Sequence, residues 1–382
     1  MKSNYKRLGC YIQKVEHRNH DLKVTRLLGL SMTKEFRETT SNIVGTDMSV
    51  YRVMSKYQFA CDFMSPIRVN KLPVVLKLDD EPNLVSPAYP VFEIKDRNEL
   101  DPEYLMMWFR RSEFDRYATF KCDAAIRGGY DWAELCETLI PVPHITTQRA
   151  LVKEYNAIEN RITLNQQLIQ KLEETAQAIY REWFVEGIEE KWEKVTLKQF
   201  GNIITGKTPS SDNPEDFGNV IPFVTPGDFK NYNKFALGAE RMLSIIGGAK
   251  LKSKLLVSGS VIVTCIGSDM GKIAVSAQDC ITNQQMNSIV VREPYFTDYL
   301  YYYLKSIDDE IKGVAMGGST MPMLSKSDFE KIKVVKPPET LLKNYNIVMR
   351  PINNLNVLYS KENQKLTELK DLLLSKLATV GE

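Results

Sequence analysis

The chain has 382 residues, of which 43% are hydrophobic and 26% are charged. These values are typical of a globular protein with two or three domains, and they exclude disordered, collagen-like and fibrous chains. The 50 basic and 48 acidic residues leave a formal charge of +2, so bulk charge neither favours nor excludes a polyanionic partner. A surface that binds nucleic acid must therefore come from local clustering of basic side chains.

The cysteines, the histidines and the amino-terminal residues exclude several further classes. The six cysteines and three histidines show no metal-ligand spacing, so we expect free thiols and no metal site. Residues 1–7 lack the apolar core of a signal peptide, and the most apolar stretch, residues 261–266, is far shorter than the roughly 20 residues of a membrane span. The expectation is a cytoplasmic protein with no membrane partner.

Residues 1–145 are expected to form a mixed α/β domain, because short β-branched or apolar runs alternate with turn-rich stretches. Such runs occur at residues 51–54, 74–76 and 91–94. Basic residues gather twice in this domain, and the candidate DNA contacts are Lys6, Arg7 and Arg18 in the first cluster and Arg116, Lys121 and Arg127 in the second. Each could contact phosphate, and a solvated surface charge is the alternative for any one of them.

A long helix is predicted over residues 146–187. Its apolar side chains recur at alternating steps of four and three residues, which is typical of a coiled-coil seam rather than of a stripe that lies on a sheet. The predicted seam residues are Leu151, Tyr155, Ile158, Ile162, Asn165, Ile169 and Leu172. Asn165 interrupts the apolar seam: either it is buried and fixes the register of the helix pair, or it reaches solvent where the helices cross.

Residues 188–338 are expected to form a second mixed α/β domain, which contains a nucleotide-binding pattern. Residues 201–208 match G-x-x-x-x-G-K-[ST], in which backbone amides cradle phosphates. That function needs a helix that begins at the lysine, whereas Pro209 and a polar turn follow here. We interpret the segment as an ordered polar loop that presents Lys207, Thr208 and Ser210 to a phosphate backbone, with nucleotide binding as the alternative.

The second domain also carries side chains that are suited to reading bases. Asn and Gln can pair bidentately with adenine, and Arg or Lys with guanine. The further candidates are Lys230, Asn231, Lys272, Asn283, Gln284 and Gln285. A solvated charge or a structural amide is the alternative for each of them, and residues 283–285 could equally form an internally satisfied turn. No hydrolase or methyltransferase motif accompanies them, so we expect no enzymatic activity in this chain.

A second long helix is predicted over residues 339–382, and it belongs to a repeat that runs through the whole chain. The predicted seam residues of this helix are Val348, Ile352, Leu355, Tyr359, Glu362, Leu366, Leu369 and Leu373. Each lies 197 positions after a residue in the series of the first helix, and the counterpart of Leu373 is Ala176. Pro351 predicts a kink or a restart within this helix. The dipeptides Tyr104-Leu105 and Tyr299-Leu300 stand 195 positions apart, and a prolyl segment precedes each helix.

These segments together resemble the DNA specificity subunit of type I restriction–modification systems, over essentially the full chain. Residues 140–143 and 162–174 are similar to the family's central conserved helix. The T-G-K-T-P-S run at residues 205–210 resembles the start of a target-recognition domain, and residues 263–268 with 282–285 resemble its later hallmark. Residues 84–93 fit a first-domain variety. The first domain has no T-G-x-T-P-S counterpart, so we expect the two recognition domains to read different sequences.

The resemblance implies an α+β fold class, in which two mixed α/β target-recognition domains are separated and joined by two long helices. These helices would form an antiparallel coiled coil, with an internal pseudo-two-fold repeat. The implied function is a non-catalytic subunit that reads a bipartite double-stranded DNA target and docks two modification (methyltransferase) subunits and restriction (translocase/endonuclease) subunits.

The resemblance also implies that this chain binds no cofactor, because S-adenosylmethionine, ATP and Mg would belong to the partner subunits. Two alternatives remain besides this reading. One is a coiled-coil scaffold whose helices recruit other proteins, and the other is the nucleotide-binding protein described above for residues 201–208.

Overall fold

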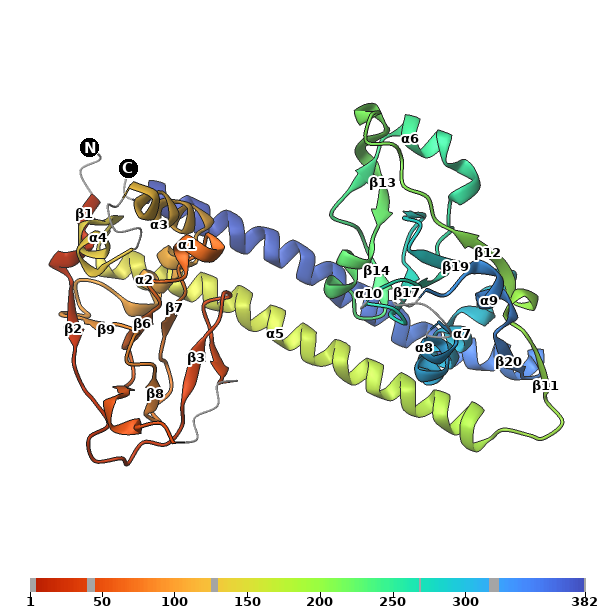
Figure 1. Ribbon diagram of the computed structural model, residues 1–382, viewed down its shortest axis with the longest axis horizontal. Coiled ribbons are helices and arrows are strands. Elements are labelled where there is room, and N and C mark those ends of the chain that lie inside the picture. Colours follow the sequence, from red (N-terminus) through yellow and green to blue (C-terminus); the bar gives the residue numbers. More distant parts are fainter. Residues whose placement is uncertain (1–4, 40–44, 125–129, 268, 316–322, 381–382) are drawn as a thin grey trace. The chain divides into compact units, whose positions relative to one another are not determined.

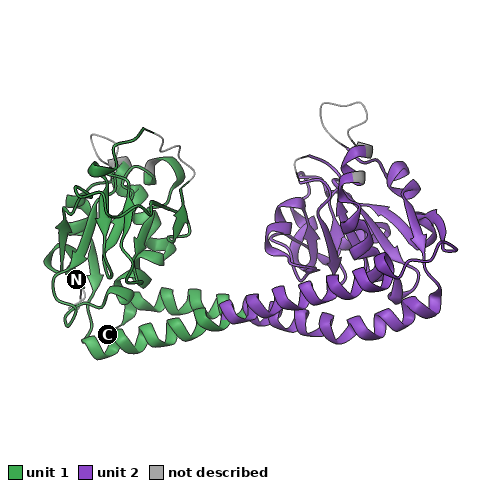
Figure 2. Cartoon of the chain, turned by 90° about the horizontal axis from the view of Figure 1, so that it is seen from below, with its two compact units in different colours: residues 1–161, 365–382 green, residues 162–364 purple. Residues whose placement is uncertain are grey.

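The computed structural model describes residues 5–39, 45–124, 130–267, 269–315 and 323–380. The chain forms two compact units, unit 1 with residues 1–161 and 365–382, and unit 2 with residues 162–364 (Figure 2). Two long helices, α5 (Ile145–Arg181) and α10 (Glu339–Lys376), each contribute residues to both units. The unit boundary therefore crosses both helices.

Unit 1 is built on a four-stranded sheet with the order β2-β9-β6-β7, in which all neighbours are antiparallel (Figure 1). The strands of this sheet are β2 (Ile12–Val15), β6 (Phe59–Cys61), β7 (Val74–Leu76) and β9 (Val91–Ile94). Three two-stranded ladders accompany it: β1 (Tyr5–Arg7) with β10 (Leu139–Pro141), β3 (Leu28–Leu30) with β4 (Phe36–Glu38), and β5 (Arg52–Met54) with β8 (Asn83–Val85).

Helices cover the sheet of unit 1 and complete its core. They are η1 (Leu8–Cys10), η2 (Met48–Val50), α1 (Pro66–Val69), α2 (Pro102–Arg110), α3 (Ser112–Ala124), α4 (Trp132–Glu137) and η9 (Leu377–Thr379). Helix α2 starts at the N-cap Asp101, whose carboxylate accepts from two backbone amides of the first turn. Phe109 of α2 packs edge-on against Phe59 of the sheet, with ring centroids 6.0 Å apart, so burial of aromatic surface joins helix to sheet.

Unit 2 contains a five-stranded sheet with the order β12-β19-β16-β17-β14 and a smaller sheet with the order β15-β13-β18. The strands are β12 (Gly201–Thr205), β13 (Phe217–Val224), β14 (Phe235–Ala236), β15 (Met242–Leu243), β16 (Val261–Thr264), β17 (Ile273–Ser276), β18 (Ile281–Thr282) and β19 (Met286–Val291). A separate ladder pairs β11 (Glu193–Thr196) with β20 (Lys333–Lys336). Strands β16 and β19 thus lie next to each other in the interior of the larger sheet.

The helices of unit 2, besides its parts of α5 and α10, are short. They are η3 (Glu182–Glu186), η4 (Leu197–Gln199), η5 (Pro214–Asp216), α6 (Ile245–Lys250), η6 (Pro226–Asn231), η7 (Lys252–Lys254), η8 (Pro294–Phe296), α7 (Thr297–Ser306), α8 (Asp308–Ala315) and α9 (Lys326–Lys331). Tyr299 and Leu300 of α7 are buried in one core with Tyr345 of α10. The aromatic run at residues 299–304 is therefore a packed helix.

The two units repeat one topology, which confirms the predicted internal repeat. Strands β12, β19, β16 and β17 follow the same order and the same antiparallel directions as β2, β9, β6 and β7. The repeated tyrosines make equivalent hydrogen bonds: the hydroxyl of Tyr104 donates to the carbonyl of Pro141 at 3.1 Å, and that of Tyr299 to the carbonyl of Val335 at 2.5 Å. Burial raises the pKa of both phenols, which keeps them protonated as donors.

The long helices pair antiparallel within each unit. In unit 2, Asn165 of α5 contacts Glu362 of α10, while Trp183, in η3 directly after α5, contacts Tyr345 of α10, so the two helices run in opposite directions. In unit 1, Lys370 forms an ion pair with Glu159 at 3.0 Å. Helix α10 continues without a break through Pro351, so the predicted restart at that residue is wrong. The predicted α+β fold class with an antiparallel helix pair is confirmed.

Asn165 is buried inside this helix pair. Its side-chain amide donates to Glu362 at 3.0 Å and to Asn363 at 2.9 Å, both within unit 2. The alternative that Asn165 reaches solvent is therefore wrong. A buried amide that needs these two acceptors favours one register of α5 against α10.

The predicted seam of α10 is wrong at alternate positions. Val348, Leu355 and Leu369 are 38%, 40% and 50% exposed, whereas Met349 is fully buried and Asn356 is 2% exposed. The predicted series followed the four–three spacing of the first helix, and at two of these positions the next residue along the chain is buried instead. The remaining predicted members, Ile352, Tyr359, Glu362, Leu366 and Leu373, are half-buried. In α5, Tyr155, Ile162, Asn165 and Ile169 are buried, and Leu151, Ile158 and Leu172 are half-buried.

Candidate nucleic-acid interface

Strand pairing gathers three polar segments at one end of the larger sheet of unit 2. Thr205 ends β12 opposite Asn287, and Thr264 ends β16 opposite Met286. Because neighbouring strands are antiparallel, residues 206–210, 265–267, 269–272 and 283–285 all emerge at the same end. Residues 206–210 and 283–285, which the sequence singled out separately, thus form one surface with the loop that joins β16 to β17.

Backbone contacts hold the T-G-K-T-P-S loop against residues 282–286. The amide of Gly206 donates to the carbonyl of Met286 at 3.2 Å, and the amide of Lys207 donates to the carbonyl of Thr282 at 2.9 Å. A Cβ atom at Gly206 would lie 2.1 Å from the carbonyl oxygen of Asn283, so only glycine fits this approach. The hydroxyl of Thr208 donates to the side-chain oxygen of Gln284.

Lys207, Ser210 and Gln284 are exposed on residues 206–210 and 283–285, and Lys272 is exposed on the loop that joins β16 to β17. Lys207 makes no ion pair with any residue in the described part of the chain. By contrast, the amide of Asn283 donates to Gln285 at 2.9 Å, and the backbone amide of Gln285 donates to Asn283 at 3.1 Å. Residues 283–285 therefore form the internally satisfied turn, while the side chain of Gln284 faces outward.

The other candidates of unit 2 are exposed, and two of the cations pair with carboxylates. Lys230 contacts Glu240 at 2.9 Å, and the hydrogen bond that it donates to that carboxylate raises the pKa of Lys230. Lys272 contacts Asp269 at 2.6 Å, and the hydroxyl of Ser210 donates to Asp212 at 3.2 Å. Asn231 is exposed at the end of η6. Lys207 therefore contributes the most available positive charge of the predicted set in this unit.

The sequence analysis missed the capping box that shapes the loop after β13. Thr225 caps η6, and the buried carboxylate of Asp228 accepts from both the amide and the hydroxyl of Thr225 at 2.7 Å. A second oxygen of Asp228 accepts from the amide of Glu240 at 2.7 Å. The sequence signal for this feature is the T-x-x-D spacing of Thr225 and Asp228, which is a variant of the capping box with aspartate at the third helical position.

The basic candidates of unit 1 do not form the surfaces that their sequence clustering suggested. Lys6 and Arg7 lie on β1, whereas Arg18 follows the far end of β2. Arg7 pairs with Glu137 at 3.2 Å, and the guanidinium of Arg18 donates to the carbonyl of Val50 at 3.0 Å. The amino-terminal basic residues are thus divided between the two ends of a strand.

The second basic cluster of unit 1 is largely compensated by carboxylates. Arg116 contacts Glu113 at 3.7 Å within α3, and Lys121 contacts Glu134 at 2.9 Å. The hydrogen bond that Lys121 donates to the carboxylate of Glu134 raises the pKa of Lys121. Arg127 lies outside the described residues. Arg116 and Lys121 therefore do not create a local excess of positive charge on this surface.

The geometry of residues 201–216 does not fit a nucleotide-binding loop. Strand β12 pairs antiparallel with β19, and Lys207 is followed by a turn and the three-residue η5 rather than by a helix. The helix N-terminus that would hold a phosphate is thus missing from this stretch. Within the described residues, no group of His, Cys, Asp or Glu is arranged to hold a metal ion, and no helix is long and apolar enough to cross a membrane.

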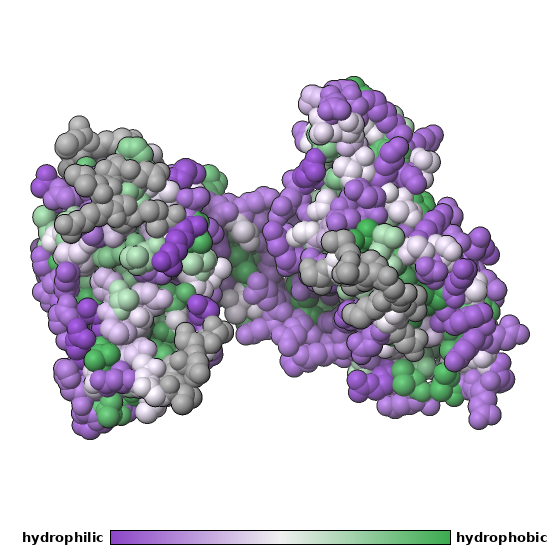
Figure 3. All heavy atoms as spheres, in the orientation of Figure 1, coloured by the Kyte–Doolittle hydropathy of each residue, from purple (hydrophilic) through white to green (hydrophobic). Residues whose placement is uncertain are grey.

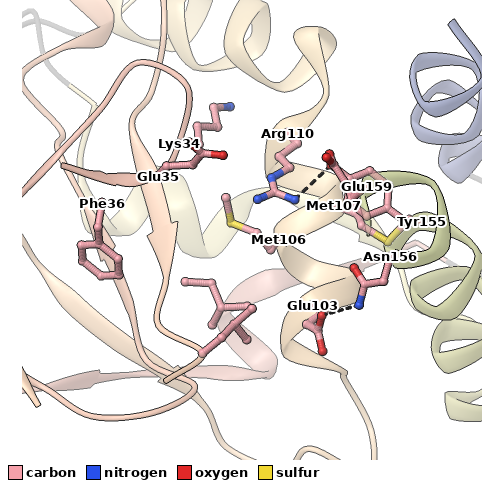
Figure 4. Close-up of a pocket in the computed structure, with 12 residues that line it drawn as sticks. Lys34, Glu35, Phe36, Glu103, Met106, Met107, Arg110, Tyr155, Asn156 and Glu159 are labelled. Atoms are coloured by element: carbon pink, nitrogen blue, oxygen red, sulfur yellow. Dashed lines mark hydrogen bonds between the residues drawn. The ribbon is translucent and has the colours of Figure 1, made fainter. Parts of the chain in front are cut away.

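Unit 1 contains a cavity of about 340 Å³ between α2, α5 and the β3–β4 hairpin (Figure 4). Its polar side chains satisfy one another, since Arg110 donates to the hydroxyl of Tyr155 at 3.0 Å and Asn156 donates to Glu103 at 2.7 Å. Met106 and Met107 line it as well. These internal pairs join α2 to α5 within unit 1.

Apolar side chains are exposed along the parts of α5 and α10 that belong to unit 2. Each is at least 40% exposed, and they are Leu164 and Leu168 on α5 and Ile347, Leu355 and Leu358 on α10. The part of unit 2 that holds β13 and α6 shows mostly hydrophilic residues in Figure 3, although Val220, Ile245 and Ile246 are exposed there. Leucines that a helix pair leaves uncovered are typical of a surface that binds another protein. We call these five residues the helix-pair apolar surface.

Comparison with known proteins gives a consistent result. Residues 189–375 match the family model described as the type I restriction modification DNA specificity domain. The chain is 26% identical to the type I restriction enzyme HindI specificity subunit of Haemophilus influenzae, over 77% of this chain and 80% of that protein. It is 24% identical to the MjaIX specificity subunit of Methanocaldococcus jannaschii, over 50% of this chain and 44% of that protein.

A solved structure shares the fold. The crystal structure of the type I restriction-modification S subunit from M. genitalium aligns with a TM-score of 0.60, at 15% identity, over 98% of this chain and 95% of that one. At this identity the likeness concerns the fold alone. It includes both units and both long helices, because nearly the whole chain is covered.

Proposed function

Because the chain belongs to the family of type I restriction–modification DNA specificity subunits, we propose that it reads a bipartite DNA target for a methyltransferase complex. The family prediction made from the sequence is thereby confirmed. Members of this family are the non-catalytic component of their systems. We further propose that each unit contacts one half of the target, in the cytoplasm where host DNA lies.

The observation that carries this function is the duplicated sheet. Unit 2 holds the matched specificity domain, and unit 1 repeats its strand order with a different set of loops. Two modules of one fold that engage one ligand gain effective concentration if their spacing suits it. Different loops on one scaffold are what an asymmetric target of two half-sites requires.

Unit 2 would contact its half-site through the surface at residues 206–210 and 283–285. An exposed lysine beside a backbone-held loop suits a phosphate contact, which supplies affinity without sequence information. An exposed glutamine amide suits the edge of adenine in the major groove. Lys207 and Gln284 supply these two groups on one surface.

Partner subunits would bind the helix-pair apolar surface. Its leucines and isoleucine lie on α5 and α10, away from the loops at the end of the sheet, so that DNA and protein contacts use separate elements. Two modification subunits would bring S-adenosylmethionine and the methyltransferase chemistry. Restriction subunits would bring ATP, Mg and cleavage.

The test is expression of the chain with its modification subunits in a host without adenine methylation, followed by single-molecule sequencing of the genome. We expect one methylated motif with two defined halves and a fixed gap, and none when this chain is left out. A continuous motif, or methylation that does not require this chain, would contradict the proposal. Assembly with partners but without any motif would favour the scaffold alternative.

A further inference from the structure

Topology identifies a loop in unit 1 at the place that the T-G-K-T-P-S loop occupies in unit 2. Strand β2 corresponds to β12 in sheet order and direction, so residues 16–26, which follow β2, correspond to the loop that follows β12. This loop lies at the lower end of unit 1 in Figure 1. Its sequence contains no glycine and no T-G-x-T-P-S motif, so the sequence pattern does not reveal the correspondence.

The loop is held rigidly around one buried side chain. Asn19 is 1% exposed, and its side-chain amide donates to the carbonyl of Val24 at 2.9 Å while its oxygen accepts from the amide of Val24 at 3.2 Å. The amide of Val53 donates to the carbonyl of His17 at 3.0 Å, and the amide of Leu84 to that of Arg26 at 2.7 Å, which anchors both ends. The loop therefore has a defined shape before any ligand binds.

Leu22 at the tip of this loop has an unusual backbone and side-chain placement. Its φ is +55°, in the left-handed region that a branched apolar residue rarely adopts, and the side chain is 56% exposed. The amide of Leu22 donates to the carbonyl of Asn19 at 3.0 Å. Glycine or asparagine would suit this turn better, so neither local conformation nor burial accounts for a leucine here.

The side chains around Leu22 suit a polyanion. His17 and His20 are exposed, and Arg18 directs its guanidinium to a backbone carbonyl rather than to a carboxylate. Among the described residues, Lys23 pairs with exposed Asp21 at 3.0 Å, and Arg26 pairs with exposed Glu38 at 3.5 Å. Such solvated pairs exchange readily for phosphate contacts.

We propose that residues 16–26 form the DNA-contacting loop of unit 1, and that Leu22 touches base edges and determines specificity for the half-site that this unit reads. The basic side chains would contact phosphates, and the leucine would make the apolar contact that distinguishes one base from another. This inference rests on the proposed function, and it adds the specificity residue of unit 1.

The experiment uses the complex with modification subunits, the target found by methylation sequencing, and DNA in which either half-site is scrambled. The variants are Leu22→Gly and Leu22→Asn, both compatible with a positive φ, and Leu78→Asn is the control, because Leu78 is another exposed leucine of unit 1, at 48%. Binding is measured over a range of salt concentrations, and thermal unfolding checks the fold.

We expect both Leu22 variants to unfold at or above the wild-type temperature and to lose about tenfold in discrimination at one half-site only. Their salt dependence should match that of the wild type, because no charge changes. Unchanged discrimination at both half-sites would overturn the inference while the proposed function stands. A wild-type complex that prefers no bipartite target would overturn the proposed function itself.

Discussion

At the scale of single residues, the candidate DNA surface of unit 2 depends on a glycine, Gly206, at which two backbone segments lie very close to each other. Gly206 lets the loop after β12 lie against the carbonyls of Thr282 and Asn283, and this contact places Lys207 beside Gln284. The chemistry of the lysine and of the glutamine is ordinary. Their proximity, created by one glycine, is what makes a combined phosphate and base contact feasible.

Lys207→Ala should weaken binding of the assembled complex to DNA of any sequence. Removing one phosphate contact is expected to lower the slope of log K against log salt by about 1, because one fewer counterion is released. Lys198→Ala is the matched control, since that lysine is exposed on η4 before β12 and pairs with Glu330 at 3.6 Å. Equal slopes for Lys207→Ala and the wild type would refute the phosphate contact.

Gly206→Ala should disrupt the DNA surface while the rest of unit 2 stays folded. The added Cβ would lie 2.1 Å from the carbonyl oxygen of Asn283, so the loop must move, at a cost of about 1–3 kcal/mol. Target binding and thermal unfolding are the measurements. Gly238→Ala is the control, because its Cβ would meet nothing within 4 Å, and it should leave both unchanged.

At the scale of elements, a half-buried carboxylate on α5, that of Glu173, joins this helix to α7 of unit 2. Glu173 accepts from the hydroxyl of Tyr302 at 2.8 Å and from Lys305 at 2.9 Å, both on α7. Burial acts to raise the pKa of Glu173, but the hydrogen bonds from Lys305, Gln177 and Tyr302 outweigh it, and the pKa is lowered. The helix thus holds the module through a charge as well as through apolar packing.

Glu173→Gln should reduce stability at neutral pH and flatten its dependence on acid. A pKa that is lower in the folded state gives stability that is present above the unfolded value of about 4.3 and is lost as the pH falls through the folded value. We expect a loss of about 1–2 kcal/mol at pH 7, and less further loss on acidification than in the wild type. Urea unfolding between pH 7 and pH 3 measures both.

A matched substitution separates this effect from the general removal of an acid. Glu368→Gln changes an exposed carboxylate on α10 and should leave the pH dependence as in the wild type. If both variants lose stability equally at pH 7, the bonds from Tyr302 and Lys305 do not stabilise the junction.

At the scale of the whole molecule, the chain begins and ends in the same unit. The hydroxyl of Tyr5, on β1, donates to the carbonyl of Ala378, after α10, at 2.8 Å, so the two terminal segments touch within unit 1. Unit 2 is inserted between them as one continuous stretch, residues 162–364. We therefore expect that the fold does not depend on which unit comes first along the chain.

A circular permutant should fold and keep its function. We would join residue 380 to residue 5 by a short Gly/Ser linker and open the chain between Ile188 and Glu189, in an exposed connection. The unfolding temperature should stay within a few degrees, and the methylated motif should be the same. Opening between Lys234 and Phe235 is the comparison, because Lys234 is buried and paired with Asp298 at 2.6 Å, and it should abolish folding.

The sequence by itself determined what depends on local periodicity and on repetition. The two long helices, the repeat of Tyr104 at Tyr299, and the central strands follow from patterns that are readable along the chain, because helix and strand periods show in consecutive residues. The family resemblance likewise came from short runs such as residues 205–210. All of these features rest on residues that are close in sequence.

Tertiary structure decided which residues meet. Only strand pairing brings Lys207 to Gln284, separates Lys6 from Arg18, and places the loop of Leu22 where the T-G-K-T-P-S loop lies in unit 2. The seam of α10 is a further example, because the sequence predicts Leu355 as a seam residue, whereas its neighbour Asn356 is the buried one. Which of them is buried depends on the partner helix, and that contact is absent from the local sequence.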